Sequence, residues 1–305
     1  MHVTIKSNKK FSLSMIEDHL RILGIQEGDV LLLKVDMAQV GLIEGRFKTG
    51  LLDALRNVIG PSGTLVISTF TENHFIPFIK KETVFTKETR PNTGSFARLM
   101  LDLQGCIRSE HPTNSFAAIG PDSARILEGH DATAPSYLPI LRLMDKNSKC
   151  ISIGCVHTNP GFTTTHWAQY VLGQSTRNIL RGLIGAYFLD KGELKLFKRK
   201  DFGGHNLGAI KLYGDYIQHQ LLRLGWVGNA YTAVIDTKKA YEVDLEVMRS
   251  NPRYILCNKP LCFDCRGSWL YNKRDMPLYY LRAIPRLIKR RLYNFFIKRF
   301  CTTPF

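Results

Sequence analysis

The sequence has little of what a membrane-spanning or exported protein needs. Its longest apolar runs, such as residues 30–33, are the length of a strand, whereas a helix that crosses a bilayer needs about 20 apolar residues. Residues 1–20 contain no apolar core of the kind found in signal peptides. The seven cysteines are an odd number, which suits reduced thiols better than a disulfide framework. These absences predict a cytoplasmic protein.

Gly/Ser-rich linkers and internal repeats are also missing. The chain has 305 residues, of which 44% are apolar and 22% charged, and this composition supports a packed core. We therefore expect one large domain over residues 1–260, followed by a cysteine-containing basic extension over residues 261–305.

Acidic residues are scarce, with 26 Asp and Glu against 42 Lys and Arg, so the net charge is +16. Such a charge attracts nucleic acids and anionic surfaces. However, residues 266–305 alone hold ten Lys or Arg and one Asp. More than half of the excess therefore belongs to the C-terminal tail. Because no nucleic-acid recognition motif accompanies the charge, we expect no nucleic-acid partner.

Helix-like and strand-like segments alternate along the first half of the chain. Hydrophobic spacing and turn residues predict helices over residues 12–24, 49–59, 95–103, 123–130, 165–172 and 213–224. Continuous apolar runs predict strands over residues 29–35, 64–68, 115–119 and 149–155, with weaker ones at 185–189, 194–198 and 233–235. This pattern predicts an α/β fold, a layered α/β/α domain with a mostly buried central sheet, and a basic helical tail.

Several short segments stand in a characteristic order. They are residues 28–36, 40–41, 59–66, 68–71, 93–94, 108–120 and 163–170. The block Arg-Ser-x-His-Pro-x-x-Ser, which begins at Arg108, is the most specific of them. Together they resemble the aminoglycoside 3-N-acetyltransferase family over about residues 15–175. The resemblance implies that family's own α/β fold, an acyltransferase activity and acetyl-CoA as co-substrate.

The resemblance assigns the catalytic base to His166. An imidazole titrates near neutral pH, so it can take the proton that an amine loses as it attacks a thioester. Where the family carries Glu one turn later, this chain has Gln169, which can orient the ring but supplies no charge. We expect a carboxylate from elsewhere to compensate, and Asp36 and Glu110 are the candidates.

The remaining candidate residues would bind the cofactor or shape its groove. They are Lys34, Val35, Asp36, Ser68, Thr69, Arg108, Ser109, His111, Thr164 and Thr165. Family members have His-Ser-Ser at the position of residues 34–36, so this contact differs here. Three alternatives stay open. Lys34 is also compatible with a solvent-facing strand end, Arg108 with a structural tie to a backbone carbonyl, and the threonines with helix capping.

The acceptor is predicted from charge. Aminoglycosides are polycations and call for an acidic pocket, whereas this chain is basic and has lost the family glutamate. The sequence therefore favours N-acetylation of a nucleotide- or lipid-linked amino sugar in surface polysaccharide biosynthesis. An antibiotic-modifying acetyltransferase and a non-catalytic binding protein of the same fold are the alternatives.

The tail carries two further features. Cys257, Cys262 and Cys265 form a cluster to which Cys301 could add a fourth thiol, but the spacing favours reduced thiols, and we expect no bound metal. Residues 282–300 place Ile284, Ile288, Leu292, Phe295 and Phe296 on one helical face among basic residues. This pattern suits peripheral contact with an anionic membrane, and equally a helix packed on its own domain. A homodimer is also expected.

Overall fold

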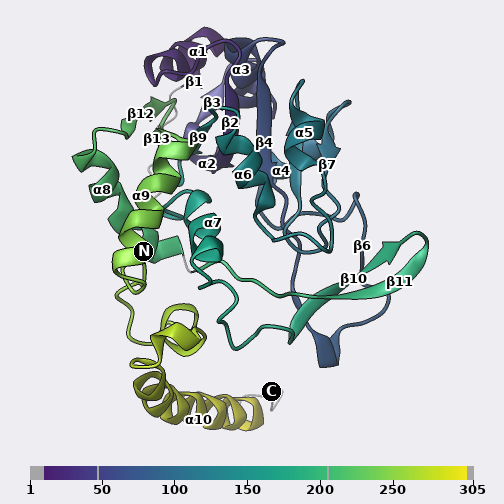
Figure 1. Cartoon of the computed structure of the whole chain (residues 1–305), viewed down its shortest axis with the longest axis vertical. Helices are drawn as coiled ribbons and strands as arrows, with labels where there is room; N and C mark the ends of the chain where they lie inside the picture. The colour runs from purple at the N-terminus through teal and green to yellow at the C-terminus, as the bar shows by residue number, and fades with distance from the viewer. Residues whose placement is uncertain (1–9, 47, 205, 301–305) are drawn as a thin grey trace.

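The computed structural model describes residues 10–46, 48–204 and 206–300 (Figure 1). Its strands are β1 Lys10–Phe11, β2 Val30–Val35, β3 Leu42–Ile43, β4 Thr64–Ser68, β5 His74–Phe75, β6 Val84–Phe85, β7 Ile107–Arg108, β8 Phe116–Ile119, β9 Lys149–Ile153, β10 Ile184–Asp190, β11 Glu193–Lys198, β12 Arg223–Val227 and β13 Ala230–Asp236. Its α-helices are α1 Leu13–Ile22, α2 Met37–Val40, α3 Gly50–Ile59, α4 Ser95–Leu101, α5 Ser123–Leu127, α6 Leu138–Met144, α7 Thr164–Val171, α8 Leu212–Gln218, α9 Thr237–Ser250 and α10 Met276–Phe300.

A seven-stranded sheet forms the centre of the molecule, in the order β12-β13-β9-β2-β4-β8-β7. The three middle strands β9, β2 and β4 are parallel, and the outer strands join them antiparallel. The carboxyl ends of parallel strands meet at one edge of a sheet, and ligand sites in α/β folds commonly lie there. The loops that follow β2, β4 and β9 therefore meet at this edge of the sheet.

Both faces of this sheet are covered. Leu31 and Leu33 point into a core with α1, α3 and α4, whereas Leu32 points into a second core with α5 to α9. Side chains of a strand alternate between faces, so a run of apolar residues is buried on both sides. The predicted layered α/β/α fold is confirmed.

The predicted elements differ from the observed ones at several places along the chain. The helix predicted over residues 213–224 ends at Gln218, and Arg223–Val227 forms the edge strand β12 instead. Gln220 has a positive φ of 55°, which interrupts the helix. Helices α6 and α9 were missed. The first turn of α9 is capped by Asp236, whose Oδ1 accepts from the Lys239 amide at 2.9 Å.

A small second sheet reaches away from the central one. It consists of the β10–β11 hairpin with β5 and β6 along its other edge (Figure 1). The chain leaving β11 returns beside α7, where it brings residues 199–204 against the start of that helix. The position of α7 is thus defined by segments far apart in sequence.

The C-terminal helix α10 lies at the opposite end of the molecule from α1 (Figure 1). The segment before it is joined to the domain by an isolated bridge between Asn178 and Trp269. Among the described residues, no helix is both long enough and apolar enough to span a membrane. The division of the chain at about residue 260 stays a prediction.

Candidate active site

His166 lies in the first turn of α7, half-buried, with Gln169 one turn behind it. The His166 Nδ1 lies 3.1 Å from Gln169 Oε1, which also accepts the Gly204 amide at 2.9 Å. Because the backbone amide can only donate, it identifies that atom of the side-chain amide as the oxygen. The oxygen can only accept from the ring, so Nδ1 carries the proton. In the neutral imidazole, Nε2 is then the basic nitrogen.

Two groups hold the imidazole from the side. The Tyr137 ring packs against it with centroids 4.8 Å apart. Gly203 lies so close that a Cβ atom there would come within 2.7 Å of His166 Nδ1 and 2.5 Å of the Tyr137 hydroxyl. The glycine is therefore required by close approach, and the segment around it determines the orientation of the ring.

Replacing Gly203 with alanine is expected to reduce catalytic turnover about 10- to 100-fold, because the new methyl group displaces His166 by a fraction of an ångström or more. Steady-state kinetics and thermal unfolding would measure this. The matched control is Gly214→Ala in α8, where a Cβ meets nothing within 4 Å. That control should retain activity and gain up to about 1 kcal/mol of stability. Equal activity of the two variants would contradict the placement of Gly203.

A buried carboxylate lies beneath the start of α7. Asp244 of α9 is fully buried, and its Oδ2 accepts from Thr164 Oγ1 at 2.7 Å and from Thr165 Oγ1 at 3.2 Å. The Tyr216 hydroxyl donates to its other oxygen. Burial raises the pKa of Asp244 to about 7, against the lowering effect of its hydrogen bonds. The two threonine hydroxyls, expected from the sequence to contact a ligand, point inward to Asp244 instead.

The loop at Arg108 is a buried hydrogen-bonded unit. Arg108 donates to Ser115 Oγ and to the carbonyls of Lys87, Thr89 and Thr69, which is the structural alternative considered for this residue. Its guanidinium therefore ties the loop to the end of β4. These internal bonds occupy the guanidinium, and the predicted contact of this loop with the cofactor stays a prediction.

Ser109 and His111 are also turned inward. Ser109 Oγ accepts the Phe116 amide at 2.9 Å, and His111 Nδ1 accepts the Asn114 amide at 3.0 Å. The His111 ring stacks on His130 with centroids 5.0 Å apart, and burial holds the pKa of His111 well below its usual value. Both residues stabilise the loop, and neither side chain faces the cavity described below.

The strand end at β2 supports α7 indirectly. Lys34 Nζ donates to the carbonyls of Asn159 and Gly161, each at 3.0 Å, in the loop that leads to α7. Burial lowers the pKa of Lys34 to about 8. Lys34 is partly buried and holds this loop, while its predicted contact with the cofactor stays a prediction. Val35 packs partly buried against the first core.

The carboxylates expected to assist His166 are engaged elsewhere. Asp36 caps α2, its Oδ1 accepting the Ala38 amide at 3.1 Å, and Glu110 pairs with Lys87 at 2.7 Å. Of the two residues expected at the end of β4, Thr69 is buried against Ser115 Oγ at 3.1 Å. Ser68 is half-buried at the strand end, and its carbonyl accepts from Thr93.

A cavity of about 310 Å³ is lined in part by Gly203 and Gly204, the two residues that also lie against the His166 and Gln169 side chains. Its walls come from the loop after β9, from residues 202–204 and from the C-terminal segment. They include Thr158, Asn159, Phe202, Asp264, Ser268 and Trp269. Among the described residues that line it, Asp264 is the one charged side chain. The segment 203–204 therefore separates this space from His166 and Gln169 by no more than its own backbone and is shared by both.

Sequence reasoning missed Tyr137, Gly203, Gly204 and Asp244. The adjacent glycines were a usable signal, because paired glycines often mark a close approach of backbone to a neighbouring group. The sequence around Asp244 and Tyr137 contains no such signal, because nothing distinguishes these two residues from the other aspartates and tyrosines of the chain. Their importance comes from contacts made across the fold.

A family model described as aminoglycoside 3-N-acetyltransferase matches residues 32–249. Aminoglycoside N(3)-acetyltransferase IX of Micromonospora chalcea is 27% identical over 158 residues, covering 46% of this chain and 56% of the relative. Aminoglycoside N(3)-acetyltransferase IV of Salmonella sp is 30% identical over 149 residues, covering 48% and 54%. The chain thus spans about half the length of the curated relatives it matches.

Solved structures show the same fold over more of the chain. The apoenzyme of aminoglycoside acetyltransferase AAC(3)-IVa has a TM-score of 0.70 at 22% identity, covering 85% of this chain and 96% of that one. A structure titled AAC-IIIb binary with CoASH has a TM-score of 0.68 at 17% identity, covering 79% and 97%. At these identities the likeness concerns the fold.

Proposed function

The chain belongs to the aminoglycoside 3-N-acetyltransferase family, and from this premise we propose that it transfers an acetyl group from acetyl-CoA to an amine of an amino sugar. The observation that carries the proposal is the His166–Gln169–Gly204 arrangement, which leaves His166 Nε2 as the basic nitrogen. The cavity beside this arrangement offers room for a substrate.

In the proposed reaction the amine nitrogen attacks the thioester carbonyl while His166 Nε2 accepts the amine proton. A carbon–nitrogen bond forms and the carbon–sulfur bond breaks. The imidazolium then returns the proton to the leaving sulfur, giving CoA thiol and the N-acetylated sugar. Gln169 keeps the ring in the productive tautomer, and Tyr137 and Gly203 limit its rotation.

Aminoglycosides are the first candidate acceptors. The curated relatives are named for this activity, and nothing in the comparisons points to polysaccharide biosynthesis, the role first predicted from charge. The anionic amino sugar stays a second candidate because the chain is basic, with a net charge of +16. The one charged residue among the described residues that line the cavity is the carboxylate of Asp264, which favours a cationic acceptor instead.

The test uses the purified full chain with acetyl-CoA and two acceptor panels. One panel contains aminoglycosides such as gentamicin and apramycin, and the other nucleotide-linked amino sugars. Mass spectrometry of the products would show which amine gains an acetyl group, and calorimetry would measure acetyl-CoA affinity. Turnover with the first panel would support an aminoglycoside as the acceptor, and turnover with the second would support an anionic amino sugar. No acetyl-CoA binding would leave the non-catalytic alternative.

The tail suggests a location for this enzyme. Helix α10 exposes apolar side chains at a spacing of three or four residues, namely Leu278, Leu281, Ile284 and Ile288. Exposed Arg282, Arg286 and Lys289 lie among them. We propose that this face rests on an anionic membrane surface. Leu292, Phe295 and Phe296, included in the predicted stripe, have side chains outside the described residues. The expected homodimer stays a prediction that gel filtration can check.

The chain should therefore co-sediment with phosphatidylserine vesicles, and binding should fall at high salt. Replacing Leu281 and Ile288 with glutamate is expected to release it. Ile22→Glu is the matched control, because Ile22 is 80% exposed on α1, comparable to the 71% of Leu281. The proposed location would be contradicted if Ile22→Glu also released the protein from the vesicles. It would be contradicted as well if the wild type bound neutral vesicles as strongly as phosphatidylserine vesicles.

A further inference from the structure

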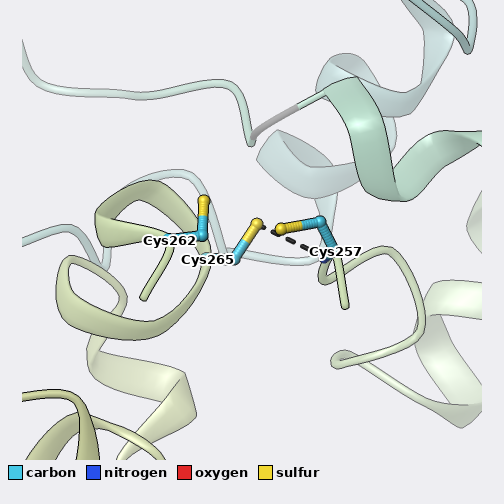
Figure 2. A group of neighbouring side chains, drawn as sticks. All are labelled: Cys257, Cys262 and Cys265. Carbon is cyan, nitrogen blue, oxygen red and sulfur yellow. Dashed lines mark hydrogen bonds between the residues drawn. The ribbon is translucent and has the colours of Figure 1, made fainter. Parts of the chain in front are cut away.

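Three cysteine side chains converge in the segment after α9. The Sγ atoms of Cys257, Cys262 and Cys265 all lie within 4.8 Å of one another. Figure 2 shows the Cys257 and Cys265 side chains pointing toward each other, with Cys262 beside Cys265. Cys257 and Cys265 are buried, and Cys262 is partly buried. The sequence predicted a cluster but not this convergence.

The backbone around the thiols is held by specific bonds. The Cys257 amide donates to Cys265 Sγ at 3.4 Å, and the Arg266 amide donates to the Cys262 carbonyl at 2.8 Å. The Arg266 guanidinium donates to the Cys257 carbonyl at 2.6 Å. Asn272 Nδ2 donates to the Cys265 carbonyl at 2.9 Å. These hydrogen bonds hold the two ends of the cluster together without a metal ion.

We propose that Cys257, Cys262 and Cys265 bind one zinc ion. Zinc takes thiolate ligands at about 2.3 Å in a tetrahedron, which places pairs of sulfurs about 3.8 Å apart. An upper separation of 4.8 Å is therefore within a small side-chain adjustment of a single-ion site. Thiolates on different irons of an iron–sulfur cluster are separated by the iron–iron distance as well, so the compact triad favours one ion.

The surroundings suit the charge of such a site. Three thiolates and one zinc ion carry a net charge of about −1. The Arg266 guanidinium, which reaches the Cys257 carbonyl, shares the carboxylate of Asp275 with Arg253, so these three side chains leave a net charge of about +1 beside the thiols. The fourth ligand is a water molecule or a donor beyond the described residues. Cys301, considered from the sequence as a fourth thiol, lies outside them.

The zinc would stabilise one wall of the cavity. Asp264, Ser268 and Trp269 line that cavity, and they lie within four residues of Cys265. The Ile179 amide donates to the Ser268 carbonyl at 2.8 Å, and the Leu270 amide donates to the Arg177 carbonyl at 2.7 Å. The ion would fix the turn from which this wall extends. Its part would therefore be structural.

The test measures metal in the full chain, purified under reducing conditions without chelator. Mass spectrometry of metals is expected to find about one zinc per chain. Cys262→Ser should lower this at least tenfold, and Cys106→Ser, a partly buried cysteine between α4 and β7, should leave it unchanged. Circular dichroism confirms that both variants are folded. Cobalt(II) added to metal-free protein should give the visible band of a tetrahedral thiolate site, which zinc then abolishes.

Four results would overturn the proposal. The first is no zinc even after the metal-free, reduced chain is incubated with it. Another is zinc retained in full by folded Cys262→Ser. Iron with inorganic sulfide in place of zinc would indicate a cluster, and a mass lower by two hydrogens in the native chain would indicate a disulfide. None of these readouts depends on acetyl transfer, so the proposed function can fail independently.

Discussion

Replacing His166 with alanine is expected to lower kcat by about 10²- to 10⁴-fold, the contribution of a positioned general base. The imidazole packs on Tyr137 and shares Gln169 Oε1 with the Gly204 amide. Its removal takes away the proton acceptor but leaves the walls of the cavity intact. Product formation measured by mass spectrometry at saturating acetyl-CoA gives the rate.

The control for His166→Ala is His157→Ala. His157 is exposed and stacks on Tyr231, with ring centroids 5.8 Å apart, and its loss should leave kcat within a factor of about two. Calorimetry should show that both variants bind acetyl-CoA as the wild type does. If His166→Ala retained full turnover, the base would have to be another group and the proposed mechanism would fail.

The second large effect is on stability. Replacing Asp244 with alanine is expected to destabilise the protein by about 3–5 kcal/mol, since hydrogen bonds to a charged or partly charged carboxyl are worth about 1.5–3 kcal/mol each. Three donors, Thr164, Thr165 and Tyr216, would lose their acceptor in a buried place. Denaturant unfolding measures the difference. Because Asp244 supports the start of α7, turnover should fall as well.

Asp244→Asn separates shape from charge, because the amide keeps an acceptor and cannot ionise. Burial raises the folded-state pKa of Asp244 from 3.8 to about 7. Between these values the folded protein holds a proton that the unfolded chain has released, so this carboxyl's stability contribution is lost as pH rises through that interval. The wild type should therefore lose stability relative to Asp244→Asn between about pH 4 and pH 7. If the free energies of unfolding of the two proteins changed with pH in parallel, the raised pKa of Asp244 would be contradicted.

Much of the fold was predictable from local patterns. The strand at residues 64–68 was predicted with the bounds it has, Thr64–Ser68. Apolar runs such as Leu31–Leu33 predict strands that are buried on both faces of a sheet, because successive side chains point to opposite faces and all of them are apolar. By contrast, Arg223–Val227 becomes a strand because it pairs with β13. That pairing is a tertiary contact, and it overrides the helical spacing of the residues before it.

The sequence by itself determined the layered fold, the family resemblance and His166 as the residue to examine. Only the tertiary structure decided what surrounds it. Asp244 meets Thr164 across 80 residues of chain, and Gly203 meets His166 although the β10–β11 hairpin lies between them in the sequence. The three thiols likewise converge only once their loop is folded. Local patterns record helix and strand preference, whereas the partner of a buried polar group depends on which distant segments the fold brings together.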